Sequence, residues 1–138
     1  MQAVDGKSSG RVVLIDIGAN GWFASSKHLI DLFDVHLPFT EAFVVEPDPQ
    51  GMRIPQAYSQ RMNITLLHHY VEVGTRRPPF DLVAWLPTLV SSRDYVVLKF
   101  DADEGTFGET MEWGVLSDIV HSSALGLIDE LFIEVRLD

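Results

Sequence analysis

Four acidic residues lie at the ends of short apolar runs, and their placement suggests that they serve one site. Asp16 lies in VVLIDIG, Glu46 follows AFVV, Asp101 follows YVVLKF, and Glu134 follows LFI. Runs of this kind are typical of strands buried on both faces of a parallel sheet. The carboxyl ends of such strands share one edge, where ligands of α/β proteins bind. A row of carboxylates there suits a ligand that is cationic or rich in hydroxyl groups.

A glycine turn follows the first of these runs directly and consists of Gly18, Ala19, Asn20 and Gly21. Glycine has no Cβ, so the backbone of such a turn can come close to a ligand. The dinucleotide fingerprint G-x-G-x-x-G is incomplete here, which makes an NAD-dependent enzyme a weaker hypothesis. The phosphate-binding loop that ends in Gly-Lys-Ser/Thr is absent from the sequence.

The other polar groups near these positions leave several interpretations open. Glu46 has the spacing of an acid that binds ribose, about 20 to 30 residues after the glycine turn. The acids around Asp101, which include Asp103 and Glu104, could bind a metal, accept a proton or favour the start of the next helix. His68 and His69 are adjacent on a predicted strand, so at most one of them can face a given site.

The elements that would position these residues alternate between strands and helices. Strands are predicted at Arg11–Ile17, Ala42–Val45, within Ile64–Val73, at Tyr95–Phe100 and at Leu131–Ile133. Helices are predicted at Ser25–Phe33, about Pro55–Met62, Leu82–Val90 and from Thr106 toward Gly126. This rhythm predicts an α/β sandwich with a mostly parallel sheet of about five strands and right-handed crossovers.

The predicted helices have identifiable caps, stops and apolar faces. Ser25 or Ser26 is expected to cap the first helix and Asp81 the third, and Gly126 is a predicted helix stop. The first helix would bury Leu29, Ile30, Leu32 and Phe33 on one face. The last would place Phe107, Met111, Leu116, Ile119 and Val120 mostly on one face, after a capping box from Thr106 to Glu109.

Length and composition indicate one domain and exclude several classes of partner. The 138 residues suit a flexible leader at 1–10 and a single domain at 11–138. A net charge of -10 disfavours nucleic-acid and anionic membrane surfaces. The chain has no cysteine and no apolar run near the roughly 18 residues of a membrane span. Its polar start resembles no signal peptide, so we expect a soluble, cytoplasmic protein.

Several segments together resemble the FkbM-type methyltransferases, most closely their eukaryotic branch. These segments are VVLIDIGAN, FVVEPDP, DYVVLKFDADEG and LGLIDELFIEV, and the resemblance extends from about Val12 to Val135. It implies a Rossmann-like three-layer sandwich and S-adenosyl-L-methionine as the cofactor. The implied reaction is methyl transfer, and we expect the acceptor to be a hydroxyl of a small molecule, sugar or glycan. No metal is implied.

The resemblance also assigns roles to individual residues. Asp16 and the turn at 18–21, formed by Gly18, Ala19, Asn20 and Gly21, would bind the methionine part of the cofactor. Glu46 would hold the ribose hydroxyls, with Pro47 shaping the turn behind it. Lys99 and Asp101 would lie near the methyl group and the acceptor. Asp101 or Glu104 is the predicted catalytic base for the acceptor hydroxyl.

Some features depart from the family pattern and favour an alternative. Gly21 follows Asn20 directly, whereas the family places one more residue between them. The segment from Asp101 to Gly105 has one extra residue. The closing antiparallel hairpin of the methyltransferase sheet is expected to be missing. The alternative is therefore a catalytically inactive methyltransferase-like domain with a binding or structural role.

Overall fold

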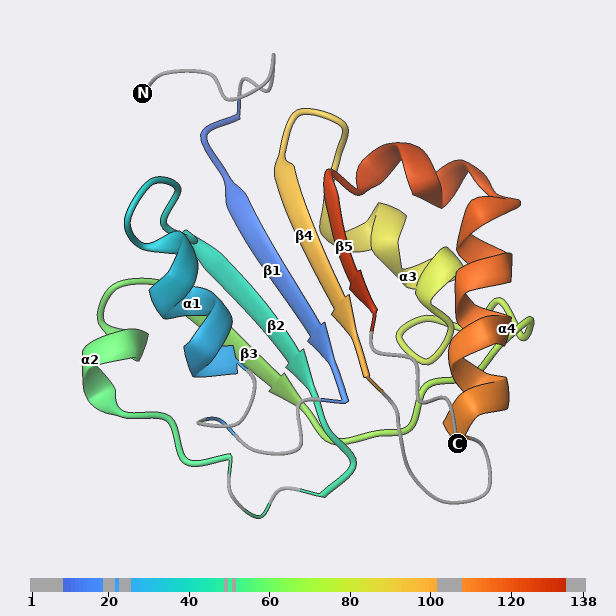
Figure 1. The fold of residues 1–138 in the computed structure, drawn as a ribbon, viewed down its shortest axis with the longest axis horizontal. Helices are drawn as coiled ribbons and strands as arrows, with labels where there is room; N and C mark the ends of the chain where they lie inside the picture. Colours follow the sequence, from blue (N-terminus) through green and yellow to red (C-terminus); the bar gives the residue numbers. More distant parts are fainter. Residues whose placement is uncertain are drawn as a thin grey trace.

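The computed structural model describes residues 9–18, 22, 26–48, 50, 52–101 and 108–133. One five-stranded sheet forms the centre of this part of the chain, and all of its strand pairs are parallel. The strands are β1 (Val12–Ile17), β2 (Glu41–Val45), β3 (Asn63–Leu67), β4 (Tyr95–Phe100) and β5 (Glu130–Ile133). Their order is β3-β2-β1-β4-β5, and the arrows in Figure 1 all point the same way.

Helices cover both faces of the sheet, which confirms the predicted α/β, Rossmann-like three-layer architecture (Figure 1). The helices are α1 (Lys27–Phe33), α2 (Gln56–Ser59), α3 (Leu82–Leu89), α4 (Gly108–Val120) and the 3₁₀ helix η2 (Ser123–Leu127). Apolar residues of α1 pack on one face of the sheet, and those of α3 and α4 pack on the other. Within the described ranges, no helix combines the length and the apolar character needed to cross a membrane.

The side chains of β1 explain its uninterrupted apolar run. Val13, Ile15 and Ile17 pack with α3 and α4, whereas Val12 and Leu14 pack with α1. All six residues of the strand are buried. Because successive side chains point to opposite faces, a central strand with helices on both sides must be apolar at nearly every position. Asp16 is the one charged residue in this strand.

The structure corrects the predicted start and apolar face of the first helix. α1 begins at Lys27, and the Ser26 side chain at its N-cap makes no capping hydrogen bond. Ser25 lies outside the described residues. Leu29 and Ile30 are buried as predicted, but Leu32 is 58% exposed. The seven-residue helix therefore buries a narrower stripe than the sequence indicated.

The end of the chain also differs from its predicted pattern. α4 ends at Val120, and Gly126 lies inside η2 instead of ending a helix. Ile119 is buried together with Val115, four residues earlier, while Val120 is 48% exposed. The predicted capping residue Thr106 and the apolar Phe107 lie outside the described residues.

Other predicted elements are confirmed, with modest changes in length. Asp81 caps α3 as predicted, because its carboxylate accepts a hydrogen bond of 3.0 Å from the amide of Val83. α2 is a single turn within the range predicted for it. β3 (Asn63–Leu67) begins one residue before the range predicted to contain a strand, Ile64–Val73, and otherwise lies within it. Residues 1–8 of the predicted leader lie outside the described residues.

Candidate functional site

The carboxyl ends of the strands bring three predicted site residues, Gly18, Glu46 and Asp101, to one edge of the sheet. Each is the first residue after its strand, and its amide extends the pairing with the neighbouring strand. These amides donate to the last carbonyl of that strand: Gly18 to Val45 (2.8 Å), Glu46 to Leu67 (2.9 Å) and Asp101 to Ile17 (2.9 Å). The backbone positions of the three residues are therefore fixed by the sheet itself.

The strand order also locates the point on this edge where a crevice forms. The chain runs outward from β1 to β2 and β3, then returns to place β4 on the other side of β1. In open α/β sheets, this reversal is the topological switch point at which ligands bind. Gly18 and Asp101 follow the two strands that flank it.

Asp16 lies at the switch point, but its carboxylate is turned into the protein. Its side chain is 0% exposed. The Ser26 hydroxyl donates a hydrogen bond of 2.7 Å to Asp16 Oδ2. Lys99 Nζ lies 3.5 Å from Asp16 Oδ1, and the Lys99 side chain is 19% exposed. Asp16 therefore lies at the predicted site, but its carboxylate contacts Ser26 and Lys99 in the interior and does not reach the surface.

Gly18 has a backbone conformation that explains the choice of glycine. Its φ angle is 75°, in the left-handed region that residues with a Cβ rarely adopt. Its amide is at the same time bonded to β2. Gly18 thus has a left-handed conformation at the first position of the predicted turn. Ala19, Asn20 and Gly21 lie outside the described residues.

Glu46 is partly exposed at the end of β2, in a turn that side-chain hydrogen bonds stabilise. Its carboxylate accepts a hydrogen bond of 3.2 Å from the amide of Asp48, which closes the turn over Pro47. Asp48 accepts in the same way from the amide of Gln50, at 3.0 Å. The ring nitrogen Nδ1 of His68 lies 3.2 Å from the Glu46 carbonyl oxygen. An acid in this place has a fixed backbone and a carboxylate near the surface.

The two adjacent histidines follow the end of β3, so the alternation of strand residues does not apply to them, and they contact different residues. His68 lies beside Glu46. The His69 ring instead packs edge-on against Phe80 and Trp85, with centroids 5.0 and 6.3 Å away. Only His68 therefore lies beside a predicted site residue.

Asp101 is partly buried at the end of β4. The other acids predicted near it, Asp103 and Glu104, lie outside the described residues, and so does Glu134. In the part of the chain that is described, no group of three or more His, Asp or Glu side chains is arranged to hold a metal ion.

Ser26 is a polar partner of the site that the sequence interpretation missed. A serine directly before a helix predicts a capping role. The backbone of Ser26 is already helical, with φ of -59° and ψ of -45°, and a capping residue usually is not. Only the fold brings the Ser26 hydroxyl to the buried carboxylate ten residues earlier.

The described site thus combines a glycine in the left-handed conformation, a partly exposed carboxylate and a buried carboxylate beside a lysine at the carboxyl edge of a parallel sheet. Comparison with known proteins adds no family assignment: no protein-family model, no curated protein and no solved structure matches this chain significantly.

Proposed function

We propose that this chain is an S-adenosyl-L-methionine-dependent methyltransferase that methylates a hydroxyl of a small molecule, sugar or glycan. The observation that carries the proposal is the convergence of Gly18, Glu46 and Asp101 on the carboxyl edge of the sheet. These residues come from the segments on which the family resemblance rests. Gly18 and Asp101 follow the two strands that flank the switch point, where α/β proteins bind nucleoside-containing ligands, and Glu46 follows the strand next to β1.

The chemistry of the described groups fits this cofactor. The Glu46 carboxylate can accept hydrogen bonds from the two ribose hydroxyls, as a strand-end acid does in nucleotide-binding sheets. Gly18 lets the backbone approach the ligand because no Cβ stands in the way. Lys99, which contacts Asp16, is partly accessible beside the site, where the family resemblance puts it near the methyl group and the acceptor.

When bound, the cofactor supplies a methyl group on a positively charged sulfur, which is already a good electrophile. The chain has to hold the acceptor oxygen in line with that methyl group, and this positioning supplies much of the rate. The new bond joins the acceptor oxygen to the methyl carbon, and the electrons of the broken bond remain on sulfur. Asp101 or Glu104 takes the proton of the acceptor hydroxyl.

A domain that binds the cofactor without turnover is the second candidate. The observation that favours it is the burial of Asp16, whose carboxylate contacts Ser26 and Lys99 and is closed to solvent. The changed spacing after Asn20 and after Asp101 points the same way. This candidate predicts cofactor affinity without methyl transfer to any hydroxylated acceptor.

Calorimetric titration with the reaction product, S-adenosylhomocysteine, tests cofactor recognition without requiring the acceptor. We expect binding in the micromolar range. NAD is the matched control because it shares the adenosine but lacks the amino-acid part. Binding of NAD in preference to the product would favour a dinucleotide enzyme. Failure of a folded chain to bind the product would contradict the proposal.

A further inference from the structure

The loop at residues 68–81 joins β3 to α3 and begins beside the candidate site. His68 is its first residue, and its ring nitrogen Nδ1 lies 3.2 Å from the carbonyl oxygen of Glu46. The loop ends at Asp81, which caps α3, and the structure describes every residue of it. It runs from the end of β3 to the side of α4 (Figure 1). The position of this 68–81 loop therefore affects the surroundings of Glu46.

Apolar packing holds the two ends of the 68–81 loop. Near its start, the His69 ring lies edge-on against Phe80 and Trp85, and Val71 packs against the core. Residues 73–78, in contrast, are all exposed. The middle of the loop therefore depends on polar contacts for its position.

Arg76 makes the polar contacts that join the middle of the loop to two helices. Its guanidinium donates two hydrogen bonds of 2.8 Å to the carboxylate of Asp118 on α4. It also donates to Asp81 at 3.1 Å, and the Arg76 amide donates to the same carboxylate at 2.8 Å. The side chains of Asp81 and Asp118 are 1% and 17% exposed. Hydrogen bonds between charged groups are the stronger class, so Arg76 fastens the loop to α4 and to the start of α3.

The backbone of Arg76 has a conformation that these contacts maintain. Its φ angle is 56°, and among the described residues other than glycine it alone has a positive φ. A residue with a Cβ disfavours this region and persists in it where the surrounding contacts hold it there. Such conformations concentrate at ligand sites and in segments that clamp ligands, which directs attention to a functional role.

We propose that Arg76 is a positioning residue of the S-adenosyl site, whose bonds to Asp118 and Asp81 fasten the 68–81 loop so that His68 stays against Glu46 when the ligand binds. This inference rests on the proposed function. A loop that is already fastened loses less conformational entropy when a ligand binds beside it. An ion pair with a purely structural role would change the stability of the fold and leave the affinity of the folded chain unchanged.

A double-mutant cycle on the dissociation constant for S-adenosylhomocysteine tests this role. Calorimetry is done well below the unfolding temperature of every variant. Arg76→Gln and Asp118→Asn should each weaken binding about three- to tenfold, within the range for residues that act on a site without touching the ligand. Because both substitutions break the same contact, the double variant should bind about as weakly as Arg76→Gln alone. Asp118→Asn leaves the contacts of Asp81 in place, so it carries the test if Arg76→Gln does not fold.

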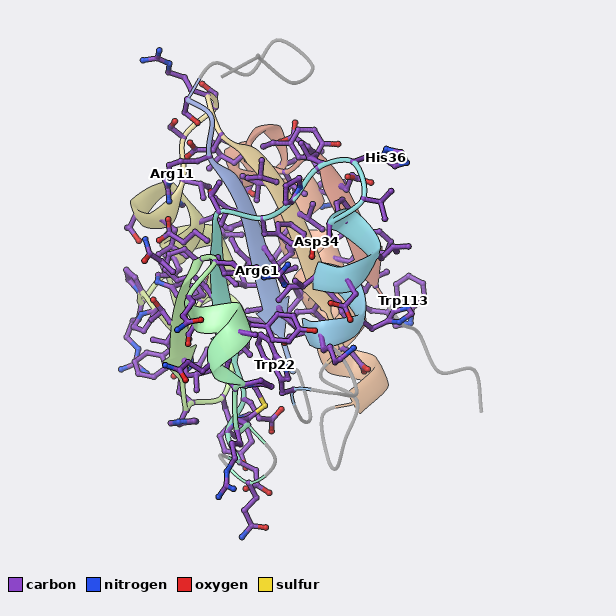
Figure 2. The ribbon with its side chains drawn as sticks, turned by 90° about the vertical axis from the view of Figure 1, so that its left-hand side faces the viewer. Arg11, Trp22, Asp34, His36, Arg61 and Trp113 are labelled. Carbon is purple, nitrogen blue, oxygen red and sulfur yellow. The ribbon has the colours of Figure 1, made fainter. Side chains whose placement is uncertain are left out.

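Hydrogen exchange of the ligand-free chain measures the state of the loop directly. The amide of Glu72 donates to the Phe80 carbonyl at 2.8 Å and closes the loop, so it should exchange faster in both variants. Glu41→Gln is the control, because it breaks an ion pair with Arg11 at the opposite end of the sheet (Figure 2). This control should change neither the affinity nor the exchange of the Glu72 amide.

The outcomes distinguish this inference from the function on which it rests. Faster exchange together with weaker, non-additive binding would establish the positioning role. Binding by the wild-type chain, with unchanged affinity in both single variants or with additive losses, would overturn the role of Arg76 and leave the cofactor assignment intact. No binding by the folded wild-type chain would overturn both.

Discussion

The carboxylate of Asp16 is removed from solvent and depends on two groups that come from distant parts of the chain. Burial of a carboxylate costs free energy, and contacts with a hydroxyl donor and an ammonium group offset part of that cost. Ser26 and Lys99 provide these contacts. We therefore expect Asp16 to stabilise the fold in addition to its proposed role in the site.

Substitution of Asp16 tests this double role. Asp16→Ala leaves the Lys99 ammonium without this partner, so we expect the free energy of unfolding to fall by about 2–4 kcal/mol. Glu46→Ala is the control, because that carboxylate is partly exposed and closes only a surface turn. Urea denaturation of both variants measures the difference. Equal stability of the two variants would contradict the stabilising role of the buried contact.

At the scale of elements, the sequence predicted the central strands better than the helices. β1 and β4 lie between two neighbours and between two helical layers, so nearly every position in them is apolar. Helix faces are harder to predict because they depend on where neighbouring elements lie. Leu32 and Val120 follow the helical period, yet both are exposed.

The sequence likewise predicted only part of the candidate site. The position of Gly18, Glu46 and Asp101 on one edge follows from parallel strands alone. The direction of the Asp16 side chain does not, because it depends on a register with β4 and on a contact with Ser26. Neither has a local signal in the sequence, since the two partners lie 83 and 10 residues away.

The segment between β3 and α3 is joined to α4 by an arginine. Arg76 donates two hydrogen bonds of 2.8 Å to the Asp118 carboxylate and also contacts the buried Asp81. The amide of Glu72 closes the same segment by donating to the Phe80 carbonyl at 2.8 Å. Hydrogen bonds from Arg76 hold the pKa of Asp118 below its ordinary value of 3.8.

This lowered pKa predicts a pH dependence with a definite sign. A carboxyl with a lowered folded-state pKa stabilises the fold above its ordinary pKa, and the effect is lost as pH falls through the folded-state value. Asp118→Asn should therefore reduce stability at about pH 6 and have a smaller effect near pH 3. Urea unfolding across that range measures this. The difference should disappear in an Arg76→Gln background, and a difference that grows with acidity would contradict the assignment.

At the scale of the whole molecule, polar and aromatic contacts join α1 and the segment around α2 on one side of the sheet. Figure 2 shows Asp34, which follows α1, facing Arg61, which follows α2, and the two side chains form an ion pair. Tyr58 of α2 donates to Asp31 of α1 at 2.8 Å. The fully buried Trp22 packs edge-on against Tyr58, with centroids 5.2 Å apart.

The two ends of the sheet have different chemistry. Arg11 lies at the amino end of β1, away from the candidate site (Figure 2), and pairs with Glu41 and Asp94. Gly18, Glu46 and Asp101 lie at the opposite end of the sheet. We propose that an S-adenosyl ligand binds at this carboxyl edge, beside the switch point between β1 and β4.

Nuclear magnetic resonance of the ¹⁵N-labelled chain, titrated with S-adenosylhomocysteine, tests the claim most directly. We predict the largest shift changes at the amides of Gly18, Glu46 and Asp101, whose backbones define the edge. The amides of Thr40 and Tyr95, at the amino ends of their strands, should stay unchanged. Shift changes centred on Thr40 and Tyr95, or none at the three edge amides under saturating ligand, would contradict the proposed site.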